Sequence, residues 1–94
     1  MINQILLIGK IKEINDKVNQ KEIVLEVERP FREEEGRVKD MFVCKLWNCI
    51  FEKIVSLCEK GDIVAIKGRV NVIDLQYLVV AENVVLLNKS KNNI

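Results

Sequence analysis

Hydrophobic residues recur at every second position along much of the chain, which is the pattern of strands that bury one face. The clearest case is Glu22–Arg29, where the alternate apolar residues are predicted to face a core: Ile23, Leu25 and Val27. The residues between them are predicted to face outward: Val24, Glu26 and Glu28. Pro30 is predicted to end this strand, because proline supplies no hydrogen-bond donor to a sheet.

Two longer segments are also predicted to be strands. Gln4–Glu13 is dense in Ile and Leu, and both faces of its first half are expected to be buried. In Asp62–Val72 the residues predicted to face inward are Val64, Ile66, Gly68, Val70 and Val72. The residues predicted to face outward on the same strand are Lys67, Arg69 and Asn71.

The connections and the last strand follow from polar residues and turn signals. Asn15 to Gln20 is predicted to be a polar loop, and the charged segment Phe31–Lys39 is predicted to be a connection around Gly36. A tight turn near Ile73–Asp74 is predicted to lead to a last strand, which runs from Tyr77 towards Leu87.

The strand predicted over Asp40–Trp47 alternates, but its two faces do not separate into apolar and polar. One is an ordinary core face made of Phe42, Cys44 and Leu46. The other is expected to meet water, yet it carries Met41, Val43, Lys45 and Trp47, the only tryptophan of the chain. A face of this composition needs an explanation beyond solvation.

A helix is predicted over Cys49–Lys60, with Asn48 as its N-cap, Glu52 in its first turn and Gly61 as its stop. Its apolar residues keep helical spacing and are expected to face the core: Ile50, Ile54, Leu57 and Cys58. The predicted fold is therefore all-β with one helix: a five-stranded OB-fold Greek-key barrel with the helix between strands three and four.

Composition limits the possible functions. The 94 residues make one domain and are 49% hydrophobic, enough for a core, with a net charge of only +1. There is no histidine, and the cysteines Cys44, Cys49 and Cys58 form no metal-binding spacing and are expected to be small buried side chains. No catalytic motif or membrane-spanning run is present. We therefore expect a cytoplasmic protein that is not an enzyme and uses no metal or cofactor.

Four segments resemble the bacterial and phage single-stranded DNA-binding proteins: NQILLIGKI, LEVERPF, KDMFVCKLWN…EKGDIVAIKGRV and YLVVAENVVLL. The similarity runs from Asn3 to about Leu87, and primosomal replication protein N shares the pattern. The resemblance implies an OB-fold domain over residues 1–87, followed by a short polar end over 88–94. It also implies sequence-tolerant binding of single-stranded DNA in replication, recombination or repair.

The resemblance implies roles for particular residues. Trp47 and Phe31 match positions that carry aromatic residues stacked on DNA, whereas Met41 stands where a further aromatic residue is usual. Lys67 and Arg69 share an outward face, as the family's phosphate contacts do. Further candidate cations are Lys45, Arg32 and Lys10. The alternatives are that Trp47 packs under the helix, that Phe31 plugs its loop, and that the cations are solvated surface charge.

Three departures from the family pattern indicate a reduced binder. Glu26 and Glu28 would repel phosphate if their face lined the groove. The hairpin between strands four and five is short and lacks the usual basic, aromatic arm. The chain ends in KSKNNI, so no recruitment of partners through an acidic tail is expected.

The resemblance implies a homo-oligomer, with dimers formed through the first strand and tetramers formed from those dimers. Such an assembly would compensate for few contacts in each subunit through avidity. A second possible function is an OB-fold protein–protein module of a primosome-like assembly, whose apolar face docks a partner instead of bases. The near-zero net charge, Glu26 and Glu28 favour that function, whereas Lys45, Trp47, Lys67 and Arg69 favour DNA.

Overall fold

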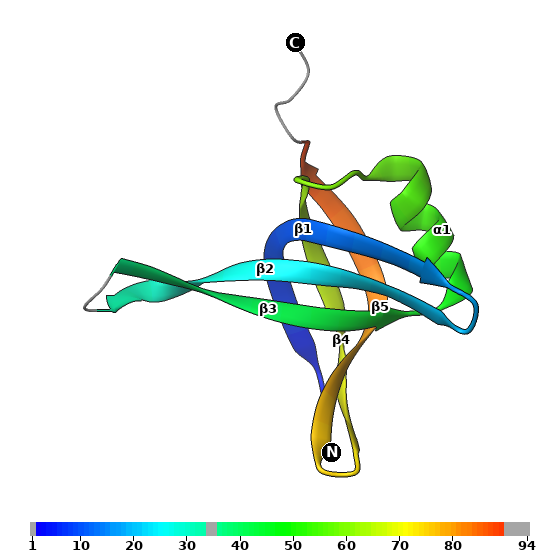
Figure 1. The fold of residues 1–94 in the computed structure, drawn as a ribbon, viewed down its shortest axis with the longest axis horizontal. Coiled ribbons are helices and arrows are strands. Elements are labelled where there is room, and N and C mark those ends of the chain that lie inside the picture. Colours follow the sequence, from blue (N-terminus) through cyan, green and yellow to red (C-terminus); the bar gives the residue numbers. More distant parts are fainter. Residues whose placement is uncertain (1, 34–35, 90–94) are drawn as a thin grey trace.

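A computed structural model describes residues 2–33 and 36–89, without the side chains at 30–33 and 36–37. Five strands close a barrel in the order β1-β2-β3-β5-β4, and one helix lies between β3 and β4 in the chain (Figure 1). The predicted OB-fold is confirmed. The elements are β1 Ile5–Lys17, β2 Gln20–Glu33, β3 Gly36–Leu46, α1 Asn48–Leu57, β4 Ile63–Ile73 and β5 Gln76–Asn88.

Alternate residues of the strands fill the barrel, as the sequence pattern predicts for sheets with one buried face. The most deeply buried strand side chains are Ile11, Ile23, Leu25, Cys44, Val64, Ile66 and Val84. All neighbouring strands are antiparallel except β3 and β5, whose parallel pairing closes the barrel. The inward positions predicted in β2, in β3 and in the first half of β4 are thus confirmed.

The first strand departs from the prediction. Leu7 and Ile11 point into the core, but Leu6 and Ile8 on the other face are 65% and 51% exposed. The expectation that both faces are buried was therefore wrong for the single chain, because no layer covers the outside of β1. On the outer face, Ile8 aligns with Ala65 on β4, and Ala65 aligns with Val85 on β5, so the apolar surface continues across three strands.

Both loops predicted in the first half of the chain are instead hairpins. β1 and β2 are separated by two residues, one of which, Asn19, has a positive φ of 68°. β2 continues past Pro30 to Glu33, and β3 already begins at Gly36. The proline is tolerated because it lies within a register shift between Glu28 and Arg32, where ladder hydrogen bonds are interrupted.

The hairpin of β4 and β5 projects beyond the barrel as an arm (Figure 1). Its turn is as short as predicted and uses two residues with positive φ, Asp74 and Leu75. Val72 was predicted to face inward but is exposed, because the arm extends past the core, and Tyr77 is 81% exposed. The arm expected to be missing is thus present in a short form, with one aromatic residue and no cation between residues 70 and 78.

The helix begins one residue earlier than predicted, and its cap is Trp47, without a side-chain hydrogen bond, instead of Asn48. Its inward residues are Phe51 and Ile54, followed by Cys58 just after its end; Leu57, predicted to be inward, is exposed. The buried stripe follows i, i+3, i+7 spacing from Phe51, which the sequence analysis overlooked. The helix ends at Leu57, before the predicted end at Lys60, and its C-cap is Cys58. Gly61, with a φ of 94°, lies in the turn that follows, so its predicted role as the helix stop was wrong.

The cysteines only partly follow the prediction. Cys44 and Cys58 are buried free thiols, and burial raises the pKa of both, that of Cys44 to about 12. Cys49 lies exposed in the first turn of α1, so its predicted burial was wrong.

Candidate nucleic-acid interface

The unusual outer face of β3 is exposed as predicted. Cys44 and Leu46 point into the barrel, while the alternate side chains face solvent: Met41, Val43, Lys45 and, just after the strand, Trp47. Exposed apolar side chains gathered on one strand indicate a contact surface.

The register of the strands brings two positively charged residues, Lys45 and Arg69, into one row on this side of the barrel. Lys45 on β3 aligns with Val80 on β5, and Val80 aligns with Arg69 on β4. The three residues therefore form one row across three strands. Beside this row the backbones of β4 and β5 lie close together, because a Cβ added at Gly68 would lie 2.0 Å from the Val80 carbonyl oxygen. Glycine at this position lets the β4 backbone approach β5 and brings Arg69 near the end of β3.

Trp47 is 59% exposed and does not pack under the helix, which excludes the core alternative raised for it. Its backbone is extended, and its carbonyl accepts a 2.9 Å hydrogen bond from the Phe51 N–H at the start of α1. The strand–helix junction thus fixes the tryptophan backbone while leaving the indole in solvent.

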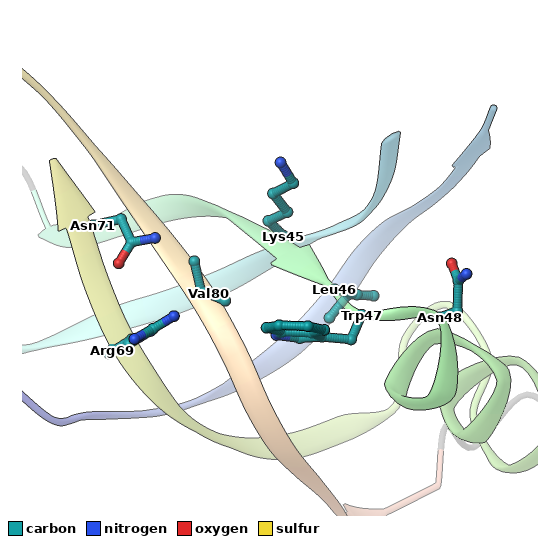
Figure 2. Close-up of a pocket in the computed structure, with 7 residues that line it drawn as sticks. All are labelled: Lys45, Leu46, Trp47, Asn48, Arg69, Asn71 and Val80. Atoms are coloured by element: carbon teal, nitrogen blue, oxygen red, sulfur yellow. The ribbon is translucent and has the colours of Figure 1, made fainter. Parts of the chain in front are cut away.

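These residues line a pocket of about 390 Å³. In Figure 2, Arg69 and Asn71 lie on one side of Val80, and Lys45 and Trp47 lie on the other. The complete lining is Lys45, Leu46, Trp47, Asn48, Arg69, Asn71 and Val80. An aromatic face beside two cations is the arrangement that single-stranded nucleic acid requires, because bases stack and phosphates need positive charge.

Among the described carboxylates, the one paired with this pocket is Glu82 on β5. Its Oε2 lies 3.9 Å from the Nε of Arg69, and both side chains are about half exposed. A long, exposed ion pair of this kind is weak. The guanidinium therefore remains available to an anionic ligand.

Two predicted cations lie outside the pocket of Trp47. Lys67 is exposed on β4 between Leu6 of β1 and Asn83 of β5. Lys10 lines a separate pocket of about 380 Å³. That pocket also contains Ile8, Gly9, Glu26, Glu28, Lys39 and Ile63.

Glu26 in this second pocket is buried, although it was predicted to project outward. Its carboxylate oxygens lie 3.1 Å from Lys39 Nζ and 3.3 Å from Lys12 Nζ. The hydrogen bond from Lys39 has the largest effect and lowers the pKa of Glu26. Burial raises that pKa, but the hydrogen bond from Lys12 and the positive charges of both lysines also lower it, so the pKa lies below its ordinary value. The carboxylate is thus neutralised by its neighbours, which weakens the predicted repulsion of phosphate.

The remaining predicted contacts are spread along the β2–β3 hairpin. Met41 is exposed on the Trp47 face, opposite Glu26 of β2. Phe31 and Arg32 lie on β2, but their side chains are outside the described residues. The pocket residues that the sequence analysis did not select are Leu46, Asn48, Asn71 and Val80. The sequence offered one indication for Asn71: it lies two residues after Arg69, so alternation along the strand places both side chains on the same outward face.

Other kinds of site are not apparent in the described part of the chain. Residues 2–33 and 36–89 contain no group of His, Cys, Asp or Glu side chains that could hold a metal ion. No helix within these ranges is long and apolar enough to span a membrane.

The structure is thus an OB-fold that carries the Trp47 pocket beside the end of β3. No protein-family model matches the chain. Single-stranded DNA-binding protein B of Bacillus subtilis is 29% identical to it over 77 residues, which cover 74% of this chain and 68% of that protein. The predicted resemblance in sequence is therefore confirmed.

Solved structures agree in fold. The mitochondrial single-stranded DNA-binding protein Rim1 of S. cerevisiae superposes with a TM-score of 0.77 at 12% identity, covering 95% of this chain and 97% of Rim1. A small single-stranded DNA-binding protein from Mycoplasma pneumoniae gives a TM-score of 0.73 at 18% identity, with both chains fully covered. At such low identities these matches establish the shared OB-fold.

Proposed function

We propose that this protein binds single-stranded DNA without sequence preference, in replication, recombination or repair. The observation that carries the proposal is the exposed indole of Trp47 in one pocket with Lys45 and Arg69. The similarity to the B. subtilis single-stranded DNA-binding protein supports the same function. The mechanism involves binding alone, without catalysis, metal or cofactor, and the protein acts in the cytoplasm.

In the proposed complex, a base stacks on Trp47 and the flanking phosphates lie near Lys45 and Arg69. Stacking on an aromatic side chain contributes about 1–3 kcal/mol per base. Lys67, Lys10, Arg32, Phe31 and Met41 extend the contact along the strands on either side. Because every base has a flat face, stacking of this kind tolerates any sequence.

A single subunit offers few such contacts, so we propose that the protein acts as a homo-oligomer. The apolar outer row of Ile8, Ala65 and Val85, beside Leu6, is the surface that a second copy would cover; its exposed members are Leu6, Ile8 and Val85. Joining several sites in one assembly increases the apparent affinity without new contacts in each site.

The test is a titration with oligothymidine, followed by Trp47 fluorescence at two salt concentrations. Trp47 is the only tryptophan, so its emission reports on one place in the molecule. We expect red-shifted, quencher-accessible emission that is quenched on binding, and duplex DNA of equal length should bind less tightly. Size-exclusion light scattering of the same sample gives the oligomeric state. Unchanged emission, with no binding detected by a second method, contradicts the proposal.

The second candidate function is docking of a protein partner. The observation that favours it is the tip of the β4–β5 arm, where apolar side chains without a nearby cation are exposed: Val72, Ile73, Leu75 and Tyr77. A pure docking module predicts that oligothymidine does not bind at any salt concentration. The titration above therefore separates the two functions.

A further inference from the structure

The side-chain amide of Asn71 lines the Trp47 pocket without a partner in the described part of the chain. Asn71 is half-buried on β4, two residues after Arg69 and opposite Leu78 of β5. Within residues 2–33 and 36–89 its side chain makes no hydrogen bond. A half-buried amide with its hydrogen-bonding capacity unused inside a pocket is available to a ligand.

Other asparagines near this strand are used by the protein itself. Asn3 donates a 2.7 Å hydrogen bond to the Val70 carbonyl and accepts a 3.1 Å bond from the Val70 N–H. Asn83 accepts a 2.9 Å bond from the Val84 N–H. Asn3 thereby satisfies the backbone of the residue next to Asn71, so Asn71 is not needed to hold the strand edge.

The pocket is suited to one nucleotide unit. Its volume of about 390 Å³ lies near the lower end of the roughly 300–1,000 Å³ of small-ligand sites. Figure 2 places Asn71 on the far side of Val80 from Trp47, whereas Lys45 lies on the same side of Val80 as the tryptophan. A base lying on the indole would thus extend its edge towards β4, the strand that carries Asn71.

We propose that Asn71 hydrogen-bonds the edge of the base that stacks on Trp47. An amide presents a donor and an acceptor side by side. Unpaired bases are read in the same way, through donors and acceptors on their Watson–Crick edges. Since the amide can turn over to exchange its donor and acceptor, it detects that a base is present without selecting which base. This inference rests on the proposed binding of single-stranded DNA.

The experiment compares Asn71→Leu, which is branched at the same carbon as asparagine but forms no hydrogen bonds, with the unaltered protein. Gln76→Leu is the matched control, because it removes an exposed amide from the same hairpin outside the Trp47 pocket. The ligands are oligothymidine, oligoadenosine and an abasic oligonucleotide of equal length, at low salt where phosphate contacts alone give measurable binding. Thermal unfolding of each variant checks the fold.

Asn71→Leu should weaken binding of oligothymidine and oligoadenosine about three- to tenfold, the effect of one lost hydrogen bond. It should leave binding of the abasic ligand unchanged, and Gln76→Leu should bind all three as the unaltered protein does. Asn71→Ala should repeat the loss, which excludes a steric effect of leucine.

Two results overturn the inference while the proposed function stands. One is undiminished binding of oligothymidine by both Asn71 variants. The other is an equal loss on the abasic ligand, which would assign Asn71 to the phosphate contacts or to the shape of the site. If the unaltered protein fails to bind any single strand, the proposed function is wrong and the inference falls with it.

Discussion

Two pockets of nearly equal volume lie on the outside of this barrel, and they differ in what surrounds their cations. The pocket of Trp47 combines Lys45 and Arg69 with an exposed aromatic ring, and no carboxylate is among its lining residues. The pocket of Lys10 has two cations in its lining as well, but Glu26 and Glu28 are beside them. Positive side chains alone do not define a site for nucleic acid, because nearby carboxylates decide whether their charge is available to phosphate.

The largest expected effect is that of Trp47→Ala. Loss of one stacked base should weaken oligothymidine binding by about 1–3 kcal/mol, or about 5- to 150-fold. Because the indole is 59% exposed, the free energy of unfolding should change little. Fluorescence anisotropy of labelled oligothymidine and thermal unfolding measure the two quantities. A large loss of stability with unchanged affinity would return Trp47 to a structural role.

The two pockets should also differ in the salt dependence of binding. For single strands, log K falls with log salt by about 0.7 for each phosphate neutralised. Arg69→Ala should therefore reduce the slope by about 0.7. Lys10→Ala should reduce it by less, because the carboxylate of Glu28 also lines its pocket and Lys39 there is paired with Glu26. Equal reductions would remove the distinction between the two pockets.

Removing the carboxylate beside Arg69 should have a smaller effect of opposite sign. Glu82→Gln frees the guanidinium from its 3.9 Å ion pair, and exposed pairs are worth at most about 1 kcal/mol. We expect affinity for oligothymidine to increase about twofold. Glu52→Gln on the exposed face of α1 is the control for the general loss of a negative charge. An equal gain in both variants would indicate a change in net charge only.

The smallest expected effect on binding is that of Glu26→Gln, which should instead change how stability depends on pH. Lys39 and Lys12 hold the folded pKa of Glu26 below its unfolded value of about 4.3. The resulting stability is present above pH of about 4.3 and is lost as pH falls through the lowered folded pKa. Denaturant unfolding should be measured at pH values from about 3 to about 6, on either side of the unfolded pKa of about 4.3. The free energy of unfolding should depend less on pH in Glu26→Gln than in the unaltered protein. Identical curves contradict this role.

The sequence predicted the fold and three of the seven residues that line the Trp47 pocket, and it did so for local reasons. Alternation is a property of each strand by itself, so the outward side chains of Asp40–Trp47 and the inward ones of Glu22–Arg29 could be predicted without knowing their neighbours. Arg69 was predicted to face outward on the same basis. The position of Arg69 next to Lys45 could not be, because it depends on the parallel pairing of β3 with β5 and on the register of β4.

The errors arose where an element lacks an expected neighbour or gains an unexpected one. Val72 and Leu6 follow the pattern of buried residues, but the arm and the outside of β1 have no layer above them in the single chain. Glu26 follows the pattern of an exposed residue, but Lys12 and Lys39 close over it. Pro30 does not end β2 as predicted, because the local register shift accommodates it.

The amino-acid sequence by itself determined the periodicity of each element, the short β4–β5 turn and the exposure of the Met41–Trp47 face. These depend on side chains that alternate along one strand and on the backbone preferences of a few residues. Only the tertiary structure decided which cations share a pocket with Trp47, that Asn71 lines it with an amide that has no hydrogen-bond partner among residues 2–33 and 36–89, and that Glu26 is neutralised. Those outcomes depend on register and barrel closure, which bring together residues distant in the chain.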